Sequence, residues 1–527
     1  MGSYACRILR RKGARAVGKS DLTPLERALK RAWQCTARDR LPFFAALAFG
    51  LAAHMFAFAN KLVNADEIES LFGKGATVTS GRWGLEAVKL IFPDYSMPWL
   101  YGVVSLVLLA VSVCLIVRLF EIKSPLMRVL LAGMIAAFPS QTGTFCFMFT
   151  SAPYALAFLF AVLAAYLTCR GGRWSFIAAA VLLTLSLGIY QAYIALTASL
   201  MLLYAVRLCL DGEQRFKSIA RYLLRALAVL VAALAVYAAV TLAVFALTGA
   251  EFNDYVRTNA NSAGILGQVR TAYDFFVYYF TYREYALITS ELSRWAHIVL
   301  MALIAAGTVY AAAKKLRRGE AAEGALLFVL TALLPLAVNC MFLAMSKDSI
   351  HTLVIYSFIA VYILAAMLAE HLAGGASLWQ RAARDAVYVI LAVVLLGNVY
   401  FANEVYLEMY LEYENAYSFY SILLSRAENT EGFESGTKLA LIGRQDNAVT
   451  TFDDKIDLGY ITGPSRGLIN AYSRENFIRR YLGSNVPLAT AEECDALAAT
   501  AEFADMAEYP YYGSIKMIDG YVVVKLG

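Results

Sequence analysis

Charged residues are scarce in this chain. Only 16% of its 527 residues are Asp, Glu, Lys or Arg, whereas 60% are hydrophobic and the mean hydropathy is +0.58. About a quarter of the residues of an ordinary soluble domain are charged. The composition therefore excludes that class and indicates a polytopic membrane protein. The net charge of +6 lies mostly in the N-terminal tail and in short loops, where membrane topology accounts for it, so it does not indicate nucleic-acid binding.

Paired cysteines and common catalytic motifs are also missing. The eight cysteines are scattered singly, and the chain has no CxxC, HExxH or GxSxG pattern. These absences argue against a disulfide framework, a zinc site and hydrolase chemistry. Residues 13–20 match the P-loop pattern, but no apolar strand precedes them to direct backbone N–H groups at a phosphate. We interpret them as part of a basic tail.

Apolar runs of spanning length recur along the chain, about eleven in all. Charged residues are almost absent inside them, as expected when each costs roughly 2.5–3.5 kcal/mol at the centre of a spanning helix. The weakest runs are 127–144, which Pro139 breaks, and 174–189, which is short. The full set is 42–62, 99–118, 127–144, 151–169, 174–189, 191–210, 223–248, 295–313, 323–345, 352–371 and 385–402.

The loop charges predict the topology. Residues 1–41 are rich in Arg and Lys, and the first run begins late and is long enough to stay as a span, so we expect no cleavable signal peptide. Every second loop after this tail is basic, which places those loops and the N-terminus in the cytoplasm. Because the number of spans is odd, the C-terminus is expected outside. We therefore predict an α-helical polytopic membrane protein whose transmembrane domain comprises residues 42–402.

Three polar regions are expected on the outer side. Loop 64–98 contains two short predicted helices, 66–73 and 83–92. Loop 249–294 is dense in Tyr and Phe, which is typical of a helix at the membrane–water boundary. Residues 403–527 have the composition of a soluble domain and are long enough for a small extracytoplasmic α/β domain. Its predicted elements are helices at 403–427, 474–482 and 490–499 and strands at 438–443 and 521–526.

Two adjacent carboxylates, Asp66 and Glu67, stand at the outer end of the first span. Adjacent side chains of a helix point about 100° apart, so one can face a substrate while the other caps the helix or binds a cation. Catalysis on a lipid-anchored substrate gives more reason for such a pair than transport does. Acidic residues are also common in loops, and Glu69, Glu86 and Asp94 share this one. A pair that merely marks the end of the span stays an alternative.

Four more outer residues suit a phosphate or a sugar. Arg82 can clamp a lipid phosphate through its forked donors, and Trp83 can stack on a sugar face. An interfacial anchor pair explains the same two residues equally well. Tyr190 and Gln191 lie where two spans meet, and an amide in so apolar a region faces a cavity or bonds to a neighbouring helix.

Lys347 and His351 lie in a short outer loop between two spans. A cation there would neutralise a phosphate leaving group, and a solvated turn is the competing interpretation. In the tail, the acidic stretch 453–457 invites a metal interpretation, but solvated turns often carry such residues. A divalent cation is possible, and the sequence predicts no residue set that would hold it.

Several of these features together resemble the GtrII-like glucosyltransferase family, which belongs to the wider GT-C class of polytopic glycosyltransferases. They are the basic tail, the first span ending in Asp66-Glu67, the motif Gly81-Arg82-Trp83, Phe138-Pro139 in the short third span, the run Ser186 to Gln191 and the α/β tail. The resemblance covers most of residues 42–402. The chain departs from the family at 146–151, where relatives often carry a stretch with Arg and Asp, and this departure leaves the substrate open.

The resemblance implies a GT-C-like fold and the transfer of a sugar, glucose, from a polyprenyl-phosphate donor to a surface glycan. The transfer would occur with inversion on the outer face of the bacterial inner membrane. Asp66 or Glu67 would be the general base. Arg82 would stabilise the phosphate charge together with Lys347 or His351 and one arginine of loop 249–294. The arginines of that loop are Arg257, Arg270 and Arg283. The aromatic loop would guide the polyprenyl tail among the membrane lipids.

Three other functions stay open: a flippase or transporter of lipid-linked glycan, a polysaccharide polymerase or ligase, and a non-catalytic assembly factor. Transporters usually show inverted repeats and polar groups at mid-span. Here the polar candidates cluster at the outer ends of the spans, which favours an enzyme at the membrane surface. A polymerase or ligase would use a lipid-linked glycan as donor, and an assembly factor would tolerate changes in loop 64–98.

Overall fold

Helices form most of the structure, a computed structural model. It describes residues 23, 39–258, 264–281, 290–346, 351–372, 377–443, 461, 469–470 and 472–526. The bundle consists of α2 (Arg40–Ala59), α5 (Pro98–Leu119), α6 (Pro125–Ala136), α7 (Pro139–Cys146), α8 (Met148–Arg170), α9 (Arg173–Ile189), α10 (Tyr193–Asp211), α11 (Phe216–Thr248), α14 (Glu291–Arg317), α15 (Ala321–Ala332), α16 (Leu334–Val338), α17 (Ile359–Leu372) and α18 (Leu378–Glu428). Its connections contain α3 (Ala65–Glu69), η1 (Val78–Ser80), α4 (Trp83–Val88), α12 (Asp254–Thr258), α13 (Ile265–Thr281), η2 (Cys340–Leu343), η4 (Thr352–Val354) and η5 (Tyr356–Phe358). The C-terminal region contains β1 (Lys438–Ile442), α20 (Arg474–Arg480), α21 (Ala491–Ala498), α22 (Ala501–Ala504), β2 (Ile515–Ile518) and β3 (Tyr521–Lys525).

Nine helical stretches of the described chain are long and apolar enough to cross a membrane. Two further apolar stretches, Arg173–Ile189 and Tyr356–Leu372, are shorter. Together these stretches coincide with the eleven predicted runs. The prediction of a polytopic helical membrane protein is confirmed.

Pro139 divides the third predicted run into two helices. α6 ends at Ala136 and α7 begins at Pro139, because proline lacks a backbone N–H and fits the first turn of a helix but not its interior. A second break at Phe147 separates α7 from α8. The backbone groups freed at this second break contact loop 64–98.

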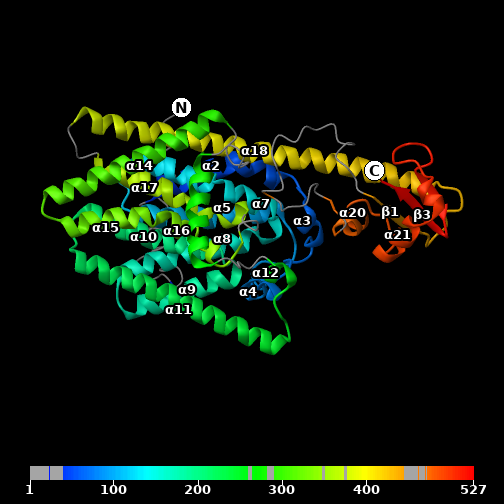
Figure 1. The fold of residues 1–527 in the computed structure, drawn as a ribbon, viewed down its shortest axis with the longest axis horizontal. Helices are drawn as coiled ribbons and strands as arrows, with labels where there is room; N and C mark the ends of the chain where they lie inside the picture. Colours follow the sequence, from blue (N-terminus) through cyan, green and yellow to red (C-terminus); the bar gives the residue numbers. More distant parts are fainter. Residues whose placement is uncertain are drawn as a thin grey trace, which may run out of the picture.

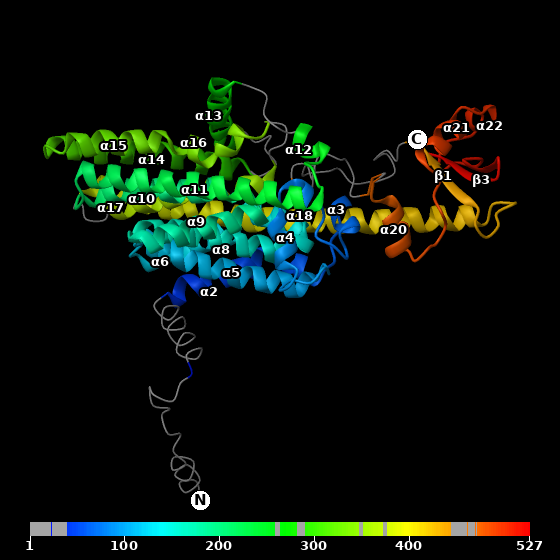
Figure 2. The ribbon, with the colours of Figure 1, turned by 90° about the horizontal axis from the view of Figure 1, so that it is seen from below.

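The connections gather at two ends of the bundle. At one end the basic connections meet: Glu370 accepts hydrogen bonds from the backbone N–H groups of Lys123 (2.8 Å) and Ser124 (2.7 Å), and Arg207 donates to the Leu119 carbonyl (2.6 Å). The other end carries α3, α4, α12 and α20 (Figures 1 and 2), and we call it the loop end. The basic connections are thus on the opposite end from loop 64–98, as the charge pattern requires. Which end faces the cytoplasm stays a prediction.

Helix α18 is 51 residues long and continues past the loop end of the bundle (Figure 1). The predicted span 385–402 and the predicted helix 403–427 are therefore one unbroken helix. Beyond it, a three-stranded sheet has the order β1-β3-β2, with β1 and β3 parallel and β2 and β3 antiparallel. The predicted strands 438–443 and 521–526 are confirmed as β1 and β3, whereas the sequence pattern did not predict β2.

The aromatic loop forms a helix, α13, that packs on the bundle. Phe275, Phe276, Tyr279 and Phe280 are buried, and each ring contacts Phe358 of η5. Their i, i+1, i+4, i+5 spacing places the four rings on one face of the helix. The predicted helix is present and packs this face against protein, and its position at a membrane boundary stays a prediction.

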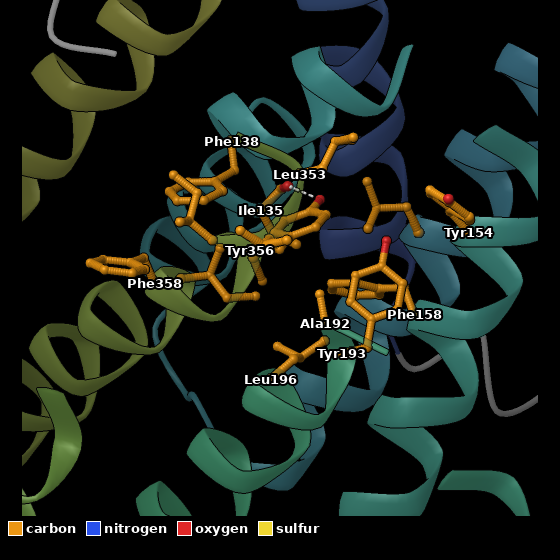
Figure 3. Close-up of a cluster of buried hydrophobic side chains, with 14 of the residues drawn as sticks. Ile135, Phe138, Tyr154, Phe158, Ala192, Tyr193, Leu196, Leu353, Tyr356 and Phe358 are labelled. Atoms are coloured by element: carbon orange, nitrogen blue, oxygen red, sulfur yellow. Dashed lines mark hydrogen bonds between the residues drawn. The ribbon is translucent and has the colours of Figure 1, made fainter. Parts of the chain in front are cut away.

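A cluster of buried rings fills the bundle between α7, α8, α10 and η5 (Figure 3). Phe138 stacks on Tyr356 with ring centroids 5.6 Å apart, and the Tyr356 hydroxyl donates to the Ile135 carbonyl at 2.7 Å. Tyr193, in the same cluster, meets Tyr190 edge-on at 5.2 Å. The packed core of the bundle therefore reaches a predicted site residue, Tyr190, at the loop end.

Candidate functional site

Helix α3, which carries both predicted carboxylates, begins at a capped residue. The Asn64 side chain accepts a hydrogen bond from the Glu67 N–H (2.8 Å) and donates one to the Cys146 carbonyl (2.7 Å) at the break between α7 and α8. An Asn cap and acidic residues in the first turn both favour a helix start. Asn64 therefore fixes the helix and attaches it to the bundle.

Glu67 is fully buried and its carboxylate is occupied. It forms an ion pair with Lys61, accepts a hydrogen bond from the Ser96 hydroxyl, and accepts a longer one from the Phe149 N–H (3.3 Å). A buried carboxylate needs such partners because its desolvation is costly. Glu67 thus ties α3 to the end of α2 and the start of α8, and it offers no accessible oxygen to an acceptor.

Asp66 differs from Glu67 in both its exposure and its contacts. Its side chain is exposed, and among the described residues its carboxylate makes no hydrogen bond or ion pair. Nearby protein atoms still limit its hydration, so desolvation raises the pKa of Asp66, assisted by the charges of Glu67 and Glu69 and opposed by that of Arg82. Of the two predicted carboxylates, Asp66 is the solvent-accessible one and Glu67 is buried.

Arg82 is held by two tyrosines. Its guanidinium donates to the Tyr154 hydroxyl at 3.1 Å and lies 5.4 Å from the ring centroid of Tyr190. Those two rings stack on each other with centroids 4.3 Å apart. Such contacts fix the direction of the guanidinium fork. The charge of Arg82 lowers the pKa of the Asp66 carboxyl against the larger effect of burial, so the two groups interact electrostatically.

Gln191 supports the turn that precedes Arg82. Its amide donates to the Ser80 carbonyl (2.8 Å) and to the Tyr237 hydroxyl (3.1 Å), and that hydroxyl donates to the Gly81 carbonyl (3.0 Å). Gly81 has φ +71°, and a Cβ there would lie 2.6 Å from the Tyr237 oxygen. The turn therefore requires glycine, and the amide N–H groups of Gln191 donate within the protein to this turn and to Tyr237.

Trp83 packs between helices. Its indole N–H donates to the Thr241 hydroxyl (3.2 Å), and its ring stacks on Tyr237. A Cβ at Gly188 would lie 2.6 Å from the Trp83 ring, so α9 approaches the indole directly. This placement favours the interpretation as an anchor over that as a sugar platform.

The other predicted cations that the structure describes are Arg257, Arg270 and His351. Arg257 is paired with Glu251 at 2.5 Å, and Arg270 is 84% exposed and lies 3.5 Å from Asp274. The segment before Arg257 docks on the turn of Arg82, because the Asn253 N–H donates to the Thr79 carbonyl (3.0 Å). His351 is half-buried at the start of η4. Arg283, Lys347 and the stretch 453–457 lie outside the described residues.

Lys74 is a buried residue that the sequence patterns missed. Its ammonium donates to the carbonyls of Pro93 (2.9 Å) and Phe149 (3.0 Å) and to the Tyr101 hydroxyl (3.3 Å). Burial lowers the pKa of Lys74 to about 8, although the charges of Asp94 and Glu67 oppose the shift. Lys74 joins its part of loop 64–98 to the Pro93 carbonyl later in the loop, to α5 and to α8. Nothing in its sequence context, Gly73-Lys74-Gly75, indicates burial.

Lys61 was also missed, although it stands only six residues before Glu67 and ends the first span. A lysine at the end of a span commonly reaches water, so this position alone did not single it out.

As for metals, the described residues contain no group of three or more His, Cys, Asp or Glu side chains that could hold an ion.

A family model described as glucosyl transferase GtrII matches residues 55–364, more than half of the chain. The match includes α3, the turn of Arg82, and the Tyr190-Gln191 pair. It ends before α18 and the C-terminal region. No curated protein and no solved structure gives a significant match.

Proposed function

The chain belongs to the GtrII glucosyltransferase family, and on that premise we propose that it transfers glucose from a polyprenyl-phosphate donor to a surface glycan. Family membership supports glycosyltransferase activity, and the apolar helices support a membrane location. The donor, the acceptor and the outer face of a bacterial inner membrane are parts of the proposal. So is an active site at the loop end.

In the proposed reaction Asp66 is the general base. It takes the proton of an acceptor hydroxyl while that oxygen bonds to the anomeric carbon of the donor. The bond from this carbon to the phosphate oxygen breaks, its electron pair leaves with the polyprenyl phosphate, and the anomeric configuration inverts. The observation that carries this assignment is the exposed carboxylate of Asp66, which makes no hydrogen bond or ion pair with the described residues and feels the charge of Arg82, whose guanidinium is held by Tyr154.

The electrostatics of Asp66 suit this role. A base works best when its pKa approaches the working pH, and the surroundings raise the pKa of this carboxyl. Arg82 is proposed to stabilise the charge that develops on the phosphate. The proposal includes Lys347, His351 and Arg283 as further cations for this phosphate. Of the two described arginines of the aromatic loop it favours Arg257, because the segment before it docks on the turn of Arg82.

Reconstituted transfer tests the base assignment. We expect Asp66→Asn to lower transfer by about 10²- to 10⁴-fold, the range that a general base contributes. The donor is synthetic polyprenyl-phosphate glucose, and the acceptor is glycan purified from cells that lack the protein. Glu86→Gln is the matched control, because Glu86 is an exposed acid of the same loop, paired with Lys89. Wild-type transfer by Asp66→Asn would refute the assignment.

Mass spectrometry of surface glycan separates the proposed function from its alternatives. Cells without the protein should lose a hexose side branch while the main polymer persists. Loss of surface glycan altogether would instead indicate a flippase or exporter. Shortened polymer would indicate a polymerase or ligase, and an unchanged hexose content together with silent changes in loop 64–98 would indicate an assembly factor.

A further inference from the structure

Helix α20 contacts the helix that carries Asp66, although about 400 residues of chain separate them. The Asn476 side chain donates to both carboxylate oxygens of Glu69, at 2.7 and 2.8 Å. Arg480 donates to the carbonyls of Ile68 (2.9 Å) and Glu69 (3.2 Å). Because α20 lies outside the part of the chain that the family model matches, family membership does not account for this contact.

These hydrogen bonds reach the last residues of α3, where the Ser70 N–H already closes the final turn on the Asp66 carbonyl. A helix of five residues is too short to be stable by itself, and the last carbonyls of any helix lack partners within it. Asn64 caps the first turn of α3 and Glu67 anchors its middle. Arg480 supplies donors to its last carbonyls, and the guanidinium also lies 5.5 Å from the centroid of the Phe72 ring.

Helix α20 is itself fixed to α18. Phe477 is fully buried, and its ring contacts Tyr413 and Tyr420 of α18 at centroid distances of 6.3 and 5.7 Å. Arg474 donates to the Tyr420 hydroxyl at 3.1 Å. Figure 1 shows α20 beside the part of α18 that extends past the bundle, next to α3. The helix is therefore a bridge between α18 and α3.

We propose that α20 positions the carboxylate of Asp66 for catalysis, with Asn476 and Arg480 as its positioning residues. The inference rests on the proposed function, since it assigns a role to the same carboxylate. Tyr472, just before α20, supports it: after burial, the charges of Asp66 and Glu69 raise the pKa of this tyrosine. In this proposal one element of the C-terminal region, α20, supports the active site.

The experiment compares Asn476→Ala and Arg480→Ala with Arg479→Ala in the full-length protein. Arg479 is the matched control, because it lies on the same helix, is exposed, and among the described residues pairs with Glu475 at 3.2 Å. We expect the first two variants to lower kcat by about 10- to 100-fold, the cost of displacing a catalytic group by about an ångström. KM for polyprenyl-phosphate glucose should change little, and Arg480→Lys should restore part of kcat.

Hydrogen exchange provides a second measurement that does not depend on activity. The Ser70 N–H donates to the Asp66 carbonyl at 2.8 Å. A peptide covering residues 65–70 should therefore exchange faster in Asn476→Ala and Arg480→Ala, and at the wild-type rate in Arg479→Ala. Wild-type kcat and exchange in both variants, with Asp66→Asn inactive, would overturn the inference alone. Full transfer by Asp66→Asn would overturn the proposed function, and with it the catalytic role of the contact. A lowered melting temperature with unchanged kcat per folded molecule would also overturn the inference, because it would show a purely structural role.

Discussion

Loop 64–98 and the segment 249–281 both connect spans and both carry predicted site residues, but they are built differently. Three polar residues of loop 64–98 bond to distant parts of the chain, in addition to local pairs: Glu67 to α8, Lys74 to α8, and Glu69 to α20. In the segment 249–281, the arginines pair with acids a few residues away, and the tightly packed face is apolar.

This difference determines how precisely each region holds its side chains. An active site needs groups held to a fraction of an ångström, and packing or long-range hydrogen bonds supply that. Arginines with exposed local partners keep several rotamers, because surface ion pairs are weak. The contrast predicts that catalytic effects concentrate in loop 64–98 and fade through the segment 249–281.

Among the cations of the two regions, Arg82 should have the largest effect when it is removed. We expect Arg82→Gln to lower transfer by about 10²- to 10³-fold, the typical cost of losing a preorganised charge partner of a transition state. The pH profile should also move. Asp66 acts as a base only when ionised, so activity falls as the pH drops through its pKa. Arg82 holds this pKa down against burial, so its removal raises the pKa and shifts the acid limb to higher pH.

Activity of Arg82→Gln is measured against pH with saturating polyprenyl-phosphate glucose. Gln191→Glu is unsuitable as a control because Gln191 supports the same turn, so we choose Arg170→Gln, at the opposite end of the bundle. An acid limb that stays in place, or moves to lower pH, would show that the two groups do not interact.

The next effect concerns stability. Glu67→Gln should lower the free energy of unfolding by about 3 kcal/mol, the lower end for breaking a buried ion pair, because Lys61 keeps partial access to water. Thermal unfolding in detergent measures the loss. Adding Lys61→Met should recover part of it, since the second change removes the unpaired cation. If Glu67→Gln melted like the wild type yet lost transfer, Glu67 and not Asp66 would carry the chemistry.

Tertiary structure explains why the sequence could identify the pair Asp66-Glu67 but could not tell which of the two acids is exposed and which is buried. The end of the first span and the position of both acids follow from a hydrophobic run, which is a local property. Of the three partners that occupy Glu67, Lys61 is close in sequence, but Ser96 and Phe149 lie 29 and 82 residues away. The same reason applies to Gln191: an amide among apolar residues was recognisable, but its partner, the turn at Gly81, was not.

Spans were predictable for the opposite reason. Each crosses an apolar medium and satisfies its own backbone hydrogen bonds, so its sequence alone carries the signal. The contact of Asn476 with Glu69 joins residues that are about 400 positions apart, and no local sequence pattern predicts that they meet.

The smallest effects are expected in the segment 249–281, and they grade with distance from the turn of Arg82. Arg257→Ala should lower transfer only a few-fold, because the segment before it docks on that turn through Asn253. Arg270→Ala should stay within about twofold of wild type, because its exposed pair with Asp274 contributes little. Initial rates at subsaturating polyprenyl-phosphate glucose check both variants, since a weak phosphate contact affects KM first. A loss above about tenfold for Arg270→Ala would break the contrast between the two regions, because a distant and loosely held cation would then act on the leaving group.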